Sequence, residues 1–167
     1  MIGMDDIRRA KILIVDDQVA NVELLRALLA ASGYTDVSST SDPRAVAPLH
    51  ERNRYDLILL DLHMPGMDGF QVMEALKPIE AGAWLPVLVV TAQPDKKLAA
   101  LEAGARDFVD KPFDTVEVLT RIRNLLEVRL LHRESTSHGA LLEQTVRERT
   151  AELQRFRSAM DATSDAI

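Results

Sequence analysis

The chain has 167 residues, 47% of them hydrophobic and 28% charged, which is enough for one soluble domain with a real core and an appendage. Its 20 basic and 26 acidic residues leave a formal net charge of −6, which argues against general binding of nucleic acid. The lack of cysteine excludes disulfides, thiol catalysis and Cys-type zinc sites, and we expect a cytoplasmic protein because the sequence has neither a signal peptide nor a membrane-length apolar run.

Short apolar runs alternate with longer stretches whose apolar residues have helical spacing. Glycine, proline and N-cap residues separate them. In chain order we expect a strand at 11–15, a helix at 19–31, a strand at 34–39, a helix from 43 to about 52, a strand at 56–60, a helix at 70–76, a strand at 86–90, a helix at 95–103, a strand at 107–109 and a helix from 114. This alternation predicts an α/β fold with a doubly wound, five-stranded parallel sheet.

Polar side chains stand where the predicted strands end. Asp16 and Asp17 follow the first strand, and Asp61 follows the third. Thr91 ends the fourth strand, and Lys111 comes after the fifth. Because sites in doubly wound sheets form outside the carboxyl ends of the strands, we expect these five side chains to lie together.

An acidic cluster with one lysine can hold a divalent metal and a phosphoryl group. Mg²⁺ prefers oxygen ligands, so Asp17 and Asp61 are the expected direct ligands, with Asp16 holding a metal-bound water. An aspartate can also attack phosphorus and form an acyl phosphate. Lys111 and Thr91 would then face the phosphoryl oxygens.

Five motifs occur in order along the chain, namely Asp16-Asp17, Asp61, Met64-Pro65-Gly66-Met67-Asp68-Gly69, Thr91-Ala92 and Lys111-Pro112. Together they resemble the receiver domain of two-component response regulators, and the resemblance covers residues 9–130. It implies a flavodoxin-like sheet of strand order 2-1-3-4-5, which here would carry a long C-terminal helical extension.

The resemblance also implies a reaction. Asp61 would accept a phosphoryl group from the phosphohistidine of a partner histidine kinase or phosphotransfer protein, with Mg²⁺ as the cofactor. Asp16 and Asp17 would form the acidic metal pocket with Asp61, and the backbone carbonyl of His63 would be a further metal ligand.

A conformational switch is implied as well. Thr91 and Phe108 would be the switch pair: the hydroxyl moves toward the phosphoryl group and the ring turns inward behind it. The face made by the helix at 95–103, the strand at 107–109 and the helix from 114 would then change its contacts. Gln93 and His63 lie where the family tunes autodephosphorylation.

Other polar and sulfur-containing residues have simpler interpretations. We expect His50, His132 and His138 to be surface residues rather than ligands. Met64 and Met67 are expected to shape the loop in which they lie.

Helical spacing continues beyond the first domain. After a polar interruption at 134–139, apolar residues recur in steps of four and three as far as Met160, which is a heptad-like pattern. We therefore expect an N-terminal tail at 1–9, the receiver domain at 10–130, a helical or coiled-coil linker at 131–156 and the start of a truncated downstream domain, resembling a PAS sensor, at 157–167.

The expected partners follow from this organisation. A homodimer would form through the C-terminal helix or through the face of the fourth helix, fifth strand and fifth helix, and neither direct nucleic-acid binding nor membrane binding is expected. The sequence leaves open which output module follows: a diguanylate cyclase, a phosphodiesterase and a kinase all remain candidates.

Three other classes compete with this interpretation. A metal-dependent phosphatase with an aspartyl nucleophile usually carries a second aspartate two residues later, where this chain has His63. A flavodoxin-like cofactor binder would need a phosphate-cradling loop after the first strand, where Asp16 and Asp17 would repel phosphate. A dimerisation or scaffold module with a degenerate site is the third alternative.

Overall fold

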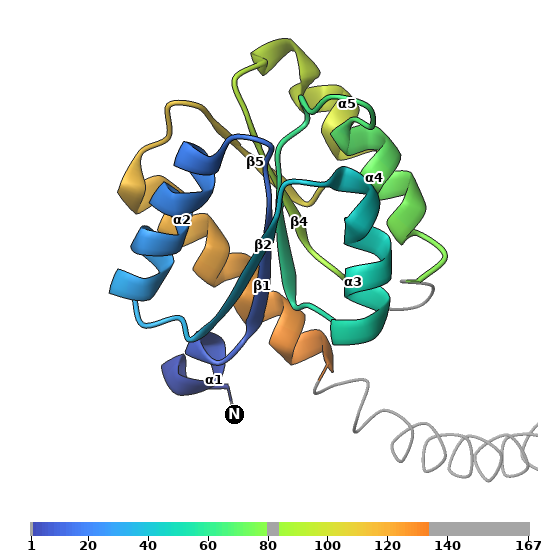
Figure 1. Cartoon of the computed structure of the whole chain (residues 1–167). Helices are drawn as coiled ribbons and strands as arrows, with labels where there is room; N and C mark the ends of the chain where they lie inside the picture. Colours follow the sequence, from blue (N-terminus) through green and yellow to red (C-terminus); the bar gives the residue numbers. More distant parts are fainter. Residues whose placement is uncertain (1, 80–83, 134–167) are drawn as a thin grey trace, which may run out of the picture. The chain divides into compact units, whose positions relative to one another are not determined.

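The computed structural model describes residues 2–79 and 84–133 (Figure 1). The linker expected at 131–156 lies outside the described residues except for its first three, and the PAS-like segment at 157–167 lies wholly outside them. The chain divides into two compact units, Met1–Leu131 and His132–Ile167, and nearly all described residues belong to the first.

Five parallel strands form a single sheet. They are β1 (Lys11–Val15), β2 (Asp36–Thr40), β3 (Leu57–Leu60), β4 (Val87–Thr91) and β5 (Asp107–Asp110). Their order across the sheet is β2-β1-β3-β4-β5, which confirms the predicted fold class. Since every pair is parallel, all five carboxyl ends lie along one edge of the sheet.

Helices connect the strands and cover both faces of the sheet. They are α1 (Met4–Arg8), α2 (Val19–Ala31), α3 (Val46–Asn53), α4 (Gly69–Leu76) and α5 (Lys97–Glu102), with the short 3₁₀ turns η1 (Pro43–Ala45) and η2 (Pro94–Lys96). Residues 115–133 are also helical and are called the C-terminal helix below. Figure 1 shows α2 and the C-terminal helix on one side of the sheet and α3 and α4 on the other.

Side chains of the central strands alternate between two hydrophobic cores. Along β1, Leu13 and Val15 pack toward α3, α4 and α5, whereas Ile12 and Ile14 pack toward α2 and the C-terminal helix. All four side chains are at most 1% exposed. Coverage on both faces explains why the central strands are continuous apolar runs rather than alternating ones.

The N-terminal segment differs from the tail expected at 1–9. Residues 4–8 form α1, and Ile7 is only 4% exposed because it packs in the core beneath α2. The amide of Gly3 donates to Oδ2 of Asp6 at 3.0 Å, which satisfies a donor at the start of this short helix. Ile7, Ala10 and the hydrogen bond from the Thr35 amide to the Arg8 carbonyl at 3.1 Å hold the segment on the domain.

The expectation that His50 is a surface residue is wrong. His50 is fully buried on α3, where its Nδ1 accepts a hydrogen bond from the amide of Tyr55 at 3.0 Å. The two rings also stack, with centroids 6.0 Å apart. A helix of mixed composition does not reveal from its sequence that its histidine turns inward. His132 is partly buried, and His138 lies outside the described residues.

Within the described ranges, the helices are too short or too polar to cross a membrane.

The packing of α2 generates a matched pair of stability predictions. Leu29 is fully buried and Leu24 is 50% exposed on the same helix. Leu29→Ala should lower the free energy of unfolding by about 2–5 kcal/mol, because it removes buried apolar surface and leaves a cavity. Leu24→Ala should change it by less than about 0.5 kcal/mol. Urea denaturation of both variants measures the difference, and equal losses would contradict this assignment of the core.

Candidate functional site

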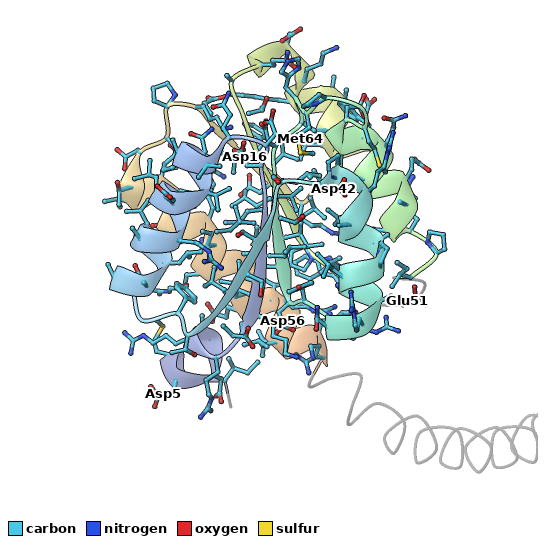
Figure 2. All side chains as sticks on the ribbon, in the orientation of Figure 1. Asp5, Asp16, Asp42, Glu51, Asp56 and Met64 are labelled. Carbon is cyan, nitrogen blue, oxygen red and sulfur yellow. The ribbon has the colours of Figure 1, made fainter. Side chains whose placement is uncertain are left out.

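The sheet itself places the predicted site residues. Asp16 and Asp61 each come one residue after a strand, and their amides donate to carbonyls of β2 and β1 at 3.3 and 3.0 Å. Thr91 is the last residue of β4, and its carbonyl accepts from the amide of Lys111 at 2.9 Å. The parallel ladder therefore brings all four residues to one edge, at which Figure 2 labels Asp16 and Met64.

The same kind of local hydrogen bond occurs at the carboxyl ends of β1, β3 and β4. A side-chain oxygen of Asp16, Asp61 or Thr91 accepts from the backbone amide two residues further along, at 2.9, 3.2 and 3.1 Å respectively. Aspartate and threonine favour such turns because their short side chains reach the local backbone. The donors are Gln18, His63 and Gln93. This bond occupies Oδ1 of each aspartate and fixes the direction of Oδ2.

The two Oδ2 atoms meet the same ammonium group. Nζ of Lys111 lies 2.9 Å from Oδ2 of Asp16 and 3.4 Å from Oδ2 of Asp61. Asp17 completes a group of three carboxylates that can each place one oxygen within 4.8 Å of the others. When all four groups are ionised, three negative charges and one positive charge leave a formal charge of −2.

The protonation of Asp61 reflects these surroundings. Burial raises the pKa of the Asp61 carboxyl above its usual range, because the charged form loses hydration, and the negative charge of Asp16 adds to the rise. The Lys111 ammonium and the His63 N–H oppose this effect. A further cation beside the cluster would lower this pKa, since positive charge favours the ionised carboxylate.

The loop after β3 depends on a glycine at position 69. The amide of Gly69 donates to the Leu62 carbonyl at 3.0 Å, so the first residue of α4 lies directly against this loop. A Cβ at Gly69 would lie 2.9 Å from Cα of Leu62 and 3.0 Å from the Asp61 carbonyl oxygen, which is too close for ordinary contact. Asp68 caps the same helix by accepting from the amide of Gln71 at 3.0 Å. The start of α4 thus sets the path of the backbone that carries Asp61.

Phe108 lies on β5 close to the buried Thr91. In the parallel register Phe108 pairs with the residue two before Thr91, and its half-buried ring packs against the core beneath α3, α4 and α5. Nζ of Lys97 lies 4.6 Å from the ring centroid and 2.8 Å from Oδ2 of Asp110. The sequence predicted neither contact of Lys97, because no motif marks a lysine in the first turn of α5.

The predicted site residues therefore fall into three groups. Asp16, Asp17, Asp61 and Lys111 converge on one cluster. His63 is next to it in the chain, is exposed, and contacts Asp61 through its amide. Thr91 and Phe108 occupy β4 and β5 beside the cluster.

Comparison with known proteins singles out the same part of the chain. The model of the response regulator receiver domain matches residues 12–123. The response regulator PleD of Caulobacter vibrioides is 42% identical over 124 residues, which are 73% of this chain but 27% of PleD. The DNA-binding dual master transcriptional regulator RpaA of Synechocystis is 38% identical over 136 residues, which are 80% of this chain and 56% of RpaA. The chain thus spans only part of the length of these relatives.

Solved structures show the same fold. A response regulator from Chloroflexus aurantiacus has a TM-score of 0.67 and 31% identity, and the match covers 71% of this chain and 98% of that one. The receiver domain of the sensor histidine kinase PA1611 from Pseudomonas aeruginosa has a TM-score of 0.65 and 29% identity, with the same coverage. That structure contains a magnesium ion coordinated in the active-site cleft.

Sheet order, strand-end chemistry and these matches agree on the class of protein: a signalling domain built on a doubly wound α/β sheet. More narrowly, the chain belongs to the response regulator receiver domain family of two-component systems.

The donor set of the cluster suits the metal that the family implies. Mg²⁺ takes oxygen ligands and is usually held by one or two carboxylates together with water and phosphate oxygens. The three carboxylates supply such oxygens within 4.8 Å of one another, and their formal charge with Lys111 matches one divalent cation. By both criteria the residues present fit Mg²⁺.

This fit predicts the effect of removing one carboxylate. Asp17→Asn should weaken Mg²⁺ affinity by at least about tenfold, since losing even an outer-shell partner of a metal ligand can cost that much. Asp36→Asn makes the same change of net charge at the exposed start of β2 and should leave the affinity within about twofold. Calorimetric titration with MgCl₂ measures both affinities. Equal binding by the Asp17 variant and the wild type would show that the metal does not use this cluster.

Proposed function

We propose that the chain is a phosphoacceptor module that receives a phosphoryl group on Asp61 from the phosphohistidine of a histidine kinase or phosphotransfer protein. Mg²⁺ would be held by Asp16, Asp17, Asp61 and the backbone carbonyl of His63. The observation that carries this proposal is the convergence of Asp16 and Asp61 on the single ammonium group of Lys111. A buried carboxylate beside a counter-charge suits nucleophilic attack on phosphorus.

The orientation of Asp61 supports a proposal for its nucleophilic oxygen. Oδ1 accepts from the His63 amide, so the proposed nucleophile is Oδ2, the oxygen that faces Lys111. A bond forms between Oδ2 and phosphorus as the bond from phosphorus to the histidine nitrogen breaks. That nitrogen keeps the electron pair, and the histidine leaves as neutral imidazole when its other nitrogen is protonated.

Two further residues would receive the phosphoryl oxygens. The ammonium group of Lys111 can move from the carboxylates to a phosphoryl oxygen and supply its counter-charge. The Thr91 hydroxyl accepts from the Gln93 amide, which leaves its own hydrogen to donate to another oxygen. When bound, Mg²⁺ would offset the negative charge shared by the cluster and the phosphoryl group.

Thr91 and Phe108 would carry the signal away from the site. A hydroxyl drawn toward the phosphoryl group would leave space behind it, and the ring of Phe108 on the neighbouring strand β5 would respond by turning inward. The surface formed by α5, β5 and the C-terminal helix would then change its contacts, in the manner of a two-state switch biased by a local charge. A helical linker after this surface would pass the change to a downstream output module.

Phosphoryl transfer can be tested directly. Incubation with Mg²⁺ and radiolabelled acetyl phosphate should give an acid-labile, hydroxylamine-sensitive label on the wild type. Asp61→Asn should reduce this label to background because the nucleophile is gone, and Lys111→Met should slow labelling on the order of 100-fold. Asp36→Asn, which changes an exposed carboxylate at the far edge of the sheet, should label at the wild-type rate.

The labelling assay and a phosphatase assay together separate the competing classes of protein. A wild-type chain that shows no Asp61-dependent label, even with its cognate kinase, would be a scaffold or dimerisation module. Many turnovers of phosphate from p-nitrophenyl phosphate per chain would instead favour an aspartyl phosphatase. The absence of an aspartate at position 63, where such an enzyme carries its acid/base, argues against that result.

We also propose a homodimer, formed through the C-terminal helix or through the surface of α5, β5 and that helix. Several large apolar side chains are exposed on these elements, namely Leu98, Leu101, Val116, Val128 and Leu131. Sedimentation equilibrium of the 167-residue chain should show dimers that beryllofluoride and Mg²⁺ strengthen. A chain that stays monomeric at high concentration in both conditions would exclude a dimer switch.

A further inference from the structure

A buried charge pair lies at the edge of the sheet opposite the proposed phosphoacceptor. Asp56 immediately precedes β3, and Arg129 comes from the C-terminal helix; they are 3% and 7% exposed. Figure 2 labels Asp56 at the end of the sheet away from Asp16. Neither Asp56 nor Arg129 takes part in the phosphoacceptor site.

The guanidinium group of Arg129 connects the starts of several strands. Its Nη1 donates to the Trp84 carbonyl at 2.7 Å and its Nη2 to the Tyr55 carbonyl at 3.3 Å, while Nε lies 3.6 Å from Oδ1 of Asp56. Oδ2 of Asp56 accepts from the amide of Lys11, the first residue of β1, at 3.0 Å. One helix side chain therefore links the segments that open β1, β3 and β4.

Arginine is the side chain suited to this position. Arg129 continues the row of core-facing residues formed by Ile122 and Leu126, which are both fully buried, so an apolar residue would be expected there. A buried charge is costly unless it is paired and its donors are used. The rigid guanidinium fork meets most of this requirement, because its two arms donate to separate carbonyls and its charge faces Asp56. Nε, 3.6 Å from Oδ1 of Asp56, makes an ionic contact but no hydrogen bond.

The helix that carries Arg129 spans the domain from edge to edge. It begins at residue 115, shortly after Lys111, and the 14 steps from 115 to 129 correspond to about 21 Å. Midway, Nη1 of Arg121 contacts both carboxylate oxygens of Asp107 at 2.8 and 2.7 Å. A change near the phosphoacceptor can therefore reach the opposite edge through this helix, provided that its far end is held.

We propose that Arg129 is a positioning residue that anchors the turns at residues 126–131 of the C-terminal helix to the sheet, so that the helix transmits a change at the phosphoacceptor edge. The anchoring follows from the contacts alone, whereas the transmission rests on the phosphoacceptor function proposed above. Arg129 binds backbone carbonyls that precede β3 and β4. Loss of these contacts should leave the chemistry at Asp61 intact.

The sequence provides a reporter next to the anchor. Trp84 is the single tryptophan of the chain, and its carbonyl accepts from Nη1 of Arg129 at 2.7 Å. The guanidinium of Arg106 lies over its ring, 5.0 Å from the ring centroid. Its fluorescence should therefore respond when the Arg129 contact is disturbed.

The test uses the 167-residue chain with and without beryllofluoride and Mg²⁺. In the wild type, this mimic of the phosphoryl group should change both the hydrogen exchange of amides 126–131 and the fluorescence of Trp84. In Arg129→Met, exchange of the same amides should be on the order of tenfold faster without the mimic, because local opening is less costly. The response to the mimic should be lost, while labelling of Asp61 by acetyl phosphate stays within about twofold of the wild type.

Two further variants keep the test decisive. Arg129→Lys retains the charge but not the fork, so it should give the same pattern if the methionine variant does not fold. Arg123→Met makes the same substitution at an exposed arginine of the same helix and should behave like the wild type in every measurement.

The outcomes separate the two proposals. Wild-type exchange at 126–131 in both Arg129 variants would overturn the anchor. Normal Asp61 labelling with no response of the wild-type helix to the mimic would overturn the transmission. In the Arg129 variants, Asp61 labelling that falls together with the protection of amides 126–131 would overturn it as well. A wild type that fails to label at all would count against the phosphoacceptor proposal alone, because the exchange of the Arg129 variants still tests the anchor.

Discussion

The approach of one ammonium group to two buried carboxylates is the constraint on which this domain depends. Lys111 contacts Asp16 and Asp61, residues that are 95 and 50 positions away in the sequence, and only a parallel sheet with these strands in this order brings them together. The carboxylates repel each other, and burial makes this repulsion more costly. The lysine offsets part of that cost, and a divalent cation is the group best suited to offset the rest.

Local backbone geometry makes this arrangement rigid. The side-chain turns at Asp16, Asp61 and Thr91 each bind one side-chain oxygen to the local backbone, so these side chains do not rotate freely. The close approach of Gly69 to the Asp61 backbone holds the adjoining loop from the other side. Preorganisation of this kind lowers the reorganisation needed during a reaction, which is how fixed groups stabilise a developing charge.

The opposite edge of the sheet holds another buried ionic contact, between Arg129 and Asp56. The C-terminal helix begins four residues after Lys111 and carries Arg129 to the opposite edge, so one element lies beside both ends of the sheet. Between them, Phe108 lies beneath the ammonium group of Lys97, a contact of the kind worth about 0.5–1 kcal/mol at partly exposed sites. Under the two proposals made above, small changes at the phosphoacceptor edge would meet a surface whose contacts are individually weak and a helix that Arg129 holds on the sheet.

Much of this architecture could be read from the sequence, since it is encoded by local patterns. Apolar runs that end in Asp16, Asp61 and Lys111 specify both the strands and the residues at their carboxyl ends, and the alternation of elements specifies a doubly wound sheet. The fold class and the membership of the family follow from these patterns. Approximate helix boundaries follow as well, because capping residues such as Asp68 act within one turn.

Only the tertiary structure decided which polar residues lie inside. His50 and Arg129 occupy helices whose sequences do not mark them as buried, and Ile7 anchors a segment that composition alone describes as a tail. The partners of Arg129 are 45 and 74 residues away, so no local pattern records them. A buried polar group is defined by the acceptors that the rest of the chain brings to it, and that information exists only once the chain has folded.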